Sequence, residues 1–139
     1  MENISLQNAE GRTFCEISGY KDVIHARWQG AVDDTMIKRA CNEIVRAVDG
    51  TQYGKLLSDQ KKAQYCPAIE GWVRTIWLPN LRYMGLQYLA MVHAPEVLTH
   101  RSYLAHDQKS VINDIVVQHF SVAEDAKQWF NLLEHVLTD

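Results

Sequence analysis

Hydrophobic and polar residues alternate along the segment Val23–Gln29, where Ile24, Ala26 and Trp28 fall on one side of the chain. This period of two predicts a β-strand with one buried face. Thr13–Ser18, just before it, is rich in residues that favour extended chain, and a short turn joins the two segments. We therefore predict two neighbouring antiparallel strands near the N-terminus.

The next segment changes to the period of an α-helix. Asp33 and Asp34 provide an acidic N-terminal cap, and Gly50 is placed to end the helix. The apolar positions recur three and four residues apart, which predicts one buried stripe. The stripe consists of Ile37, Ala40, Cys41, Ile44 and Val48.

A second amphipathic helix is predicted to begin at Cys66-Pro67 and to close at Gly85, because proline is accepted in the first turn of a helix. Pro79 must kink or divide this helix, since it lacks an N–H and clashes with the preceding turn. The stripe of this helix consists of Ile69, Trp72, Val73, Ile76 and Trp77.

Three further strands are predicted, at Tyr53–Ser58 before Asp59, at Leu86–Ala94, and at Ile115–Phe120. The interval 96–114 has a poor period, and we predict some helix near 96–104 and again near 108–113. Residues 1–11 form a polar lead-in with a short extended piece at Ile4–Leu6.

The C-terminal segment predicts a final helix. Ser121 and Glu124 form a capping box. The apolar stripe consists of Ala126, Trp129, Phe130, Leu133 and Leu137. The whole pattern predicts a single α/β domain over residues 1–139. We expect a mixed sheet of about five strands, with an antiparallel first hairpin and mostly parallel remaining strands, covered on both faces by about four helices.

Composition narrows the class of protein. The chain is 47% hydrophobic and 22% charged, as in ordinary globular domains. A net charge of −3 offers no electrostatic case for nucleic-acid binding. Cys15, Cys41 and Cys66 form no CxxC pair, so we predict reduced thiols in a cytoplasmic protein. The N-terminus lacks the pattern of a signal peptide, and we expect no transmembrane segment.

A set of structural aromatic residues, glycines and a proline resembles a known family. The set comprises Trp28-x-Gly30, Leu56–Asp59, Trp72–Pro79, Gly85, Tyr88–Val92, Phe120 and Ala126-x-x-Trp129-Phe130. Together these residues resemble the SpoIIAA-like or STAS-like proteins, which are related to anti-sigma-factor antagonists and to the STAS domains of sulfate transporters. The resemblance covers the chain from about Thr13 to Leu137. It implies a compact α/β sandwich that serves as a regulatory or ligand-binding module.

One motif of that family is missing. The phosphorylatable antagonists carry an Asp-Ser-Ser-Gly segment after the third strand, whereas this chain reads Ser58-Asp59-Gln60-Lys61-Lys62. No serine follows Asp59, so the phosphoserine mechanism is not expected here.

Ligands in open α/β sheets favour the carboxyl ends of the parallel strands. Asp59, Lys61 and His93 are predicted to lie at those ends, where they could form an acid/base or anion-binding cluster. Trp77, beside the predicted kink, is the best candidate for an apolar pocket wall, whereas Trp72 and Trp129 fit the core better. The alternative interpretation of Asp59 is that it caps a loop. We therefore predict a ligand site formed by Asp59, Lys61, Trp77 and His93.

The sequence gives little evidence for metal binding, catalysis or a cofactor. The histidines show neither HxxxH nor HExxH spacing, so no metal site is predicted. The chain contains no GxSxG, GxGxxG or phosphate-loop motif, and we predict no catalytic residue and no cofactor. Cys66 could be reactive at a helix N-terminus, but no resolving cysteine lies near it in sequence.

Three functional hypotheses follow. The first is a non-enzymatic regulatory STAS-like module that binds a small ligand or a protein partner. The second is an enzyme or small-molecule carrier with a pocket around Asp59, Lys61, Trp77 and His93. The third is assembly into a homodimer through an apolar surface of the kinked helix.

Overall fold

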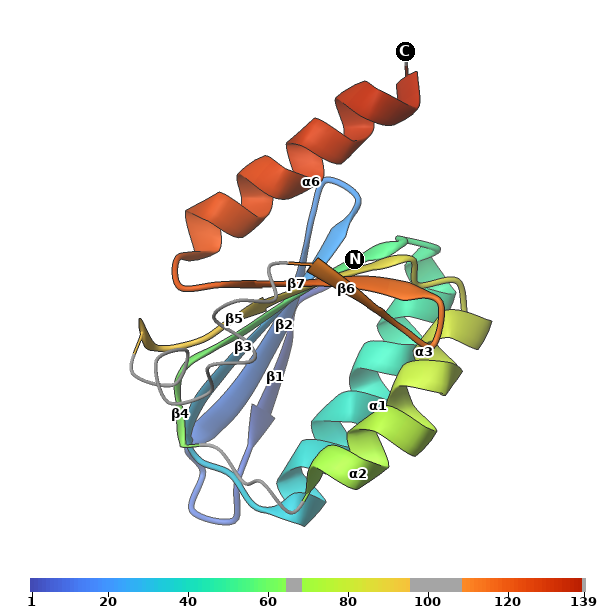
Figure 1. Cartoon of the computed structure of the whole chain (residues 1–139). Helices are drawn as coiled ribbons and strands as arrows, with labels where there is room; N and C mark the ends of the chain where they lie inside the picture. The colour runs from blue at the N-terminus through green and yellow to red at the C-terminus, as the bar shows by residue number, and fades with distance from the viewer. Residues whose placement is uncertain (65–68, 96–108, 139) are drawn as a thin grey trace.

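The computed structural model describes residues 1–64, 69–95 and 109–138, and within them the strands form one seven-stranded sheet (Figure 1). The sheet order is β1-β2-β3-β4-β5-β7-β6. The strands are β1 (Ile4–Gln7), β2 (Thr13–Tyr20), β3 (Val23–Ala31), β4 (Lys55–Gln64), β5 (Tyr88–Val92), β6 (Lys109–Ile112) and β7 (Ile115–Phe120).

Parallel pairing links the four central strands, β3, β4, β5 and β7, while β1 and β2 are antiparallel at one edge and β6 is antiparallel at the other. The predicted α/β class and the antiparallel first hairpin are therefore confirmed. The predicted count of about five strands was too low, because β1 and β6 have only four residues each. Four residues are too few to display a clear period of two.

The predicted helix near 108–113 was wrong. Residues 109–112 form strand β6, which pairs with β7 so that Ile112 lies opposite Ile115. Asn113 and Asp114 connect them with φ of 52° and 64°, the pair of positive values that a type I′ hairpin turn requires. The other predicted helix of this region, 96–104, lies outside the described residues.

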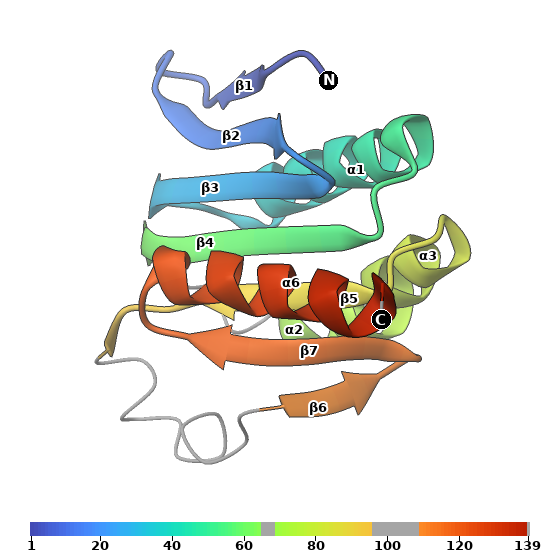
Figure 2. The same ribbon diagram turned by 90° about the horizontal axis from the view of Figure 1, so that it is seen from above.

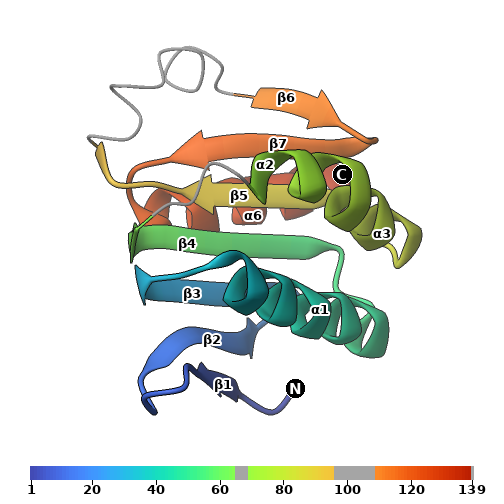
Figure 3. The ribbon, with the colours of Figure 1, turned by 90° about the horizontal axis from the view of Figure 1, so that it is seen from below.

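Helices cover the two faces of the sheet unequally (Figures 2 and 3). Helix α1 (Asp34–Thr51) and the interrupted helix α2 (Glu70–Trp72), η2 (Val73–Trp77) and α3 (Leu78–Tyr83) pack on one face. Helix α6 (Ala123–Thr138) packs on the other, over β4, β5 and β7. The described residues thus hold three helical segments rather than about four.

Two apolar cores follow from this arrangement. The larger core lies under α1 and α3 and includes the inward side chains of β3, Ile24, Ala26 and Trp28, as their alternation predicts. The smaller core lies under α6, where Ala126 and Phe130 are buried. No helix within the described ranges combines the length and apolar character needed to cross a membrane.

Helix α1 begins where the sequence predicts. The carboxylate of Asp33 accepts a hydrogen bond of 2.8 Å from the backbone N–H of Met36, so Asp33 is the N-cap. The predicted stop at Gly50 was wrong, since the helix continues to Thr51. It ends at Gln52, which adopts a left-handed conformation with φ of 59° and donates its N–H to the carbonyl of Val48.

The second helix is interrupted, as the presence of Pro79 predicts. The interruption lies just before the proline. Residues Val73–Trp77 form a π-helical turn in which the N–H of Leu78 reaches the carbonyl of Val73. Pro79 has no N–H for the helical ladder, and the wider turn lets the chain enter α3 around it. The predicted start at Cys66-Pro67 lies outside the described residues.

Strand β4 is longer than predicted. The sequence places its end at Ser58, yet the strand continues through the polar stretch to Gln64. Asp59 and Lys61 therefore lie within a strand, not in a loop after one.

Candidate functional site

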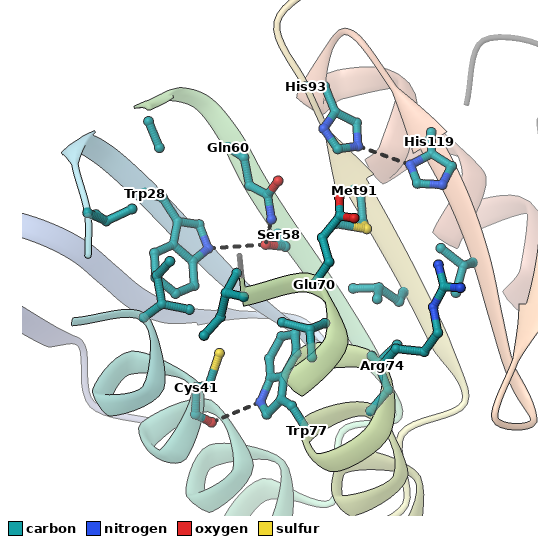
Figure 4. A pocket seen from close by; sticks show the side chains of 18 of the residues that line it. Trp28, Cys41, Ser58, Gln60, Glu70, Arg74, Trp77, Met91, His93 and His119 are labelled. Atoms are coloured by element: carbon teal, nitrogen blue, oxygen red, sulfur yellow. Dashed lines mark hydrogen bonds between the residues drawn. The ribbon is translucent and has the colours of Figure 1, made fainter. Parts of the chain in front are cut away.

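A cavity of about 190 Å³ opens between the sheet and the α1/η2 helical layer (Figure 4). Its sheet side is formed near the carboxyl ends of β3, β4, β5 and β7, the position where open α/β sheets most often bind ligands. Most of its wall is apolar. Six of the apolar wall residues are Trp28, Ile37, Leu78, Leu89, Met91 and Val117.

Two tryptophans from different layers line the cavity. Trp28, on β3, donates its indole N–H to Oγ of Ser58 on β4 at 3.1 Å. Trp77, on η2, donates its indole N–H to the carbonyl oxygen of Cys41 on α1 at 3.0 Å. Because both polar atoms are satisfied inside the protein, both rings are held in place and contribute apolar surface to the wall.

The polar side chains of the cavity come from the strand ends and from the interrupted helix. Gln60 is on β4, His93 follows β5, and His119 is on β7. Glu70 and Arg74 come from α2 and η2, one helical turn apart. Figure 4 shows these side chains around the space above the two tryptophans.

His93 and His119 are joined directly. Nε2 of His93 lies 3.0 Å from Nδ1 of His119, and the two rings are tilted by 31°. The backbone N–H of His93 also donates to the carbonyl of Phe120 at 2.9 Å, which fixes the end of β5 beside β7. His93 is buried and His119 is half-buried, so the pair forms part of the cavity wall and not a loose surface contact.

Gln60 carries an incompletely satisfied amide. Its Nε2 donates to Oγ of Ser58 at 3.3 Å, whereas its Oε1 is buried and has no hydrogen-bond partner within the described residues. A buried acceptor of this kind costs free energy unless a donor reaches it. The cavity therefore contains a polar atom that a ligand or a water molecule can satisfy.

Asp59 and Lys61 lie away from the cavity, next to a β-bulge in β4. Arg27 pairs with Asp59 and Gln29 pairs with Lys62, so β4 has one extra residue here. The backbone N–H of Lys61 donates to Oδ1 of Asp59 at 3.1 Å, so this N–H is satisfied by a side chain within the bulge. Neither residue lines the cavity.

Alternation explains this separation. Ser58 and Gln60 point to the cavity side of β4, and Asp59 between them points to the α6 side. On that side the Asp59 carboxylate raises the pKa of His25, although burial and the charges of Arg27 and Lys127 lower that pKa more, to about 4. Of the predicted site, Trp77 and His93 thus line the cavity, whereas Asp59 and Lys61 do not.

Two of the three cysteines lie within the described residues, and both are buried. Burial, and to a smaller extent the charge of Glu16, raises the pKa of the Cys15 thiol to about 12. Burial likewise raises the pKa of Cys41, whose side chain lines the cavity. Cys41 is therefore a neutral, apolar part of the wall at neutral pH. Cys66 lies outside the described residues.

Sequence reasoning missed Trp28, Arg74 and His119. Trp28 was predicted to point toward the core, but the sequence does not distinguish a residue that lines a cavity from one that is fully packed in the core. His119 shares the side of β7 that carries Val117, two residues earlier, so its position could have been inferred from alternation. Within the part of the chain that the structure describes, no three His, Cys, Asp or Glu residues are grouped as a metal site.

No protein-family model matches the chain, and no curated protein matches it significantly.

Proposed function

We propose that this protein is a non-enzymatic, STAS-like regulatory module that binds a small molecule in the cavity between the sheet and the α1/η2 layer. The observation that carries the proposal is the cavity itself, an apolar space with polar groups at its edge. This combination is typical of small-molecule sites, where apolar walls supply affinity and a few polar groups fix orientation.

The size of the cavity limits the ligand. An apolar cavity of about 150 Å³ in another protein admits benzene. A space of about 190 Å³ therefore suits one aromatic ring or a short aliphatic chain, with its polar end left near the edge. The two fixed indole rings favour an aromatic or otherwise flat apolar body.

The chemistry of the wall favours binding over reaction. The thiol of Cys41 is the strongest nucleophile type in the wall, and its raised pKa keeps it protonated at neutral pH. The enzyme or carrier hypothesis required a pocket formed by four residues. Two of them, Asp59 and Lys61, do not line the cavity. The regulatory part of the proposal rests on the resemblance to STAS-like proteins.

The homodimer hypothesis stays a separate prediction. Ile76 is 54% exposed and Tyr83 is 85% exposed on the interrupted helix, so apolar surface is available there. Light scattering that gives only monomer at high concentration would refute it.

Native mass spectrometry of freshly purified protein tests the proposed function first, because it reports both a retained ligand and its stoichiometry. Isothermal calorimetry with a panel of aromatic and aliphatic molecules of about six to ten heavy atoms then measures affinity. Binding of at least one class with one-to-one stoichiometry is expected.

A cavity-filling variant locates the binding. Ala63 lines the cavity from β4 and is half-buried, so Ala63→Leu extends a larger side chain into the space. We expect at least a tenfold loss of affinity. Ala123→Leu, at a half-buried alanine on the α6 side, is the matched control and should bind normally. Equal binding by wild type and Ala63→Leu, or no binding by any member of the panel, would refute the proposal.

A further inference from the structure

The charged and titratable groups of the cavity are distributed unevenly. Among the described lining residues, Glu70 supplies one negative charge and Arg74 supplies one positive charge, while His93 and His119 supply an imidazole pair. In Figure 4 the guanidinium of Arg74 extends on the side of the cavity where His119 lies, and the side chain of Glu70 extends from α2 toward the strand ends. Both charged side chains thus reach the same cavity as the imidazole pair.

The hydrogen bond between the two imidazoles defines how much charge the pair can hold. A ring nitrogen of one must donate and a ring nitrogen of the other must accept across the 3.0 Å contact. The neutral pair satisfies this condition, and so does a pair with one additional proton. A doubly protonated pair does not, because it has no acceptor. The pair thus carries either no charge or one positive charge while the contact persists.

From these groups we propose that the ligand is a small carboxylic acid, bound as its anion, with an apolar body between Trp28 and Trp77. The inference rests on the proposed function and specifies its ligand class. Arg74 and the His93–His119 pair face the carboxylate from η2, β5 and β7. A guanidinium is the side chain best matched to a carboxylate, because it can donate two parallel N–H bonds.

Charge balance favours an anion over the other classes. Among the described lining residues, Arg74 is the arginine at the opening, and a carboxylate ligand can form an ion pair with its guanidinium. A cationic ligand would be attracted by Glu70 but repelled by Arg74, the two charged side chains among the described lining residues. A neutral ligand would form no ion pair with Arg74.

The backbone of Arg74 is held by a hydrogen bond that does not involve its own side chain. The carbonyl oxygen of Arg74 accepts a hydrogen bond of 2.9 Å from Nδ2 of Asn113, in the turn between β6 and β7. Its side chain is exposed, so replacing the guanidinium removes the charge without a packing defect. Arg74→Gln is therefore a suitable probe of the inference.

A matched series of three compounds tests it: phenylacetate, phenylacetamide and 2-phenylethylamine. They share an aromatic ring and differ in the charge of the polar end. At pH 7 and low salt we expect phenylacetate to bind at least about tenfold more tightly than phenylacetamide, with the amine weakest. Arg74→Gln should remove most of this preference by weakening phenylacetate and leaving phenylacetamide unchanged.

Two further variants complete the experiment. Glu70→Gln should strengthen phenylacetate binding several-fold, because it removes a like charge from the opening. Arg82→Gln, at an exposed arginine of α3 that does not line the cavity, is the control and should change nothing. Equal affinity for the acid and the amide, or tightest binding of the amine, would overturn the inference while the proposed function stood. Failure of all three compounds, together with the wider panel, would overturn both.

Discussion

The indole N–H of Trp28 donates a hydrogen bond of 3.1 Å to Oγ of Ser58 on the neighbouring strand. The same oxygen accepts from Nε2 of Gln60 at 3.3 Å. Ser58 therefore accepts hydrogen bonds from two other wall residues, and it holds a tryptophan ring at the edge of the cavity. The stability of the domain and the shape of the proposed ligand site are linked through this one hydroxyl.

Ser58→Ala is expected to lower the free energy of unfolding by about 1–3 kcal/mol, because it leaves the buried indole N–H of Trp28 unpaired. Trp28→Phe removes that N–H, so adding Ser58→Ala to it should cost less than Ser58→Ala alone. Urea denaturation of the four proteins in this double-mutant cycle measures the coupling, which we expect to be about 1 kcal/mol. Additive effects would show that the hydrogen bond does not contribute to stability.

Asp59 is expected to matter for the β-bulge and not for ligand binding. Asp59→Ala removes the acceptor for the Lys61 N–H and should lower the free energy of unfolding by about 0.5–1.5 kcal/mol. Asp59→Asn keeps an oxygen at that position and should cost less. Ligand affinity, measured by calorimetry on both folded variants, should equal that of the wild type. Loss of binding in folded Asp59→Ala would contradict this account.

His25 is expected to make the fold sensitive to acid. It is buried, its Nε2 has no hydrogen-bond partner among the described residues, and burial together with Arg27 and Lys127 lowers its pKa from 6.5 to about 4. Between these values the unfolded chain binds a proton that the folded chain does not, so stability falls as the pH falls from 6.5 to about 4. The full shift corresponds to a loss of stability of roughly 3 kcal/mol.

Urea denaturation at a series of pH values checks this prediction. His25→Leu removes the titrating group and the unpaired nitrogen together, so its stability should depend less on pH over this interval. The remaining slope, from the carboxylates, serves as the internal baseline. An identical pH dependence in wild type and His25→Leu would contradict the assignment.

The turn between β6 and β7 offers a stabilising substitution. Asp114 has φ of 64°, a conformation that costs a non-glycine residue free energy and that glycine adopts readily. Asp114→Gly creates an Asn-Gly turn and should raise the free energy of unfolding by about 0.5–1 kcal/mol, whereas Asp114→Ala should lower it. Thermal unfolding distinguishes the two, and a destabilised Asp114→Gly would argue against the I′ turn.

The fold was largely predictable because its central elements are long and strongly periodic. Ile37–Val48 places a single apolar stripe on α1, and Ile115–Phe120 coincides with β7. The errors fall where the local pattern is weak or polar. Strand β6 was mistaken for helix because four residues cannot reveal a period, and its hairpin turn uses Asn-Asp instead of the stronger Asn-Gly signal.

The candidate site was predictable only in part, because side chains along a strand alternate between the two faces of the sheet. The polar stretch after Ser58 looks like a loop, so Asp59 and Lys61 were both expected at the strand end. It is instead a continuation of β4, and alternation sends Gln60 into the cavity and Asp59 to the opposite face. The contact between His93 and His119 depends on β5 lying beside β7, an order that the sequence alone does not specify.

The indole N–H signals in a ¹⁵N–¹H correlation spectrum test the ligand cavity most directly. The chain has 4 tryptophans, of which Trp28 and Trp77 line the cavity while Trp72 and Trp129 do not. Assigned by single Trp→Phe variants and titrated with phenylacetate, the signals of Trp28 and Trp77 should shift progressively and saturate, while those of Trp72 and Trp129 stay in place. Saturating shifts confined to Trp129, or no shift at any tryptophan up to millimolar ligand, would contradict the account.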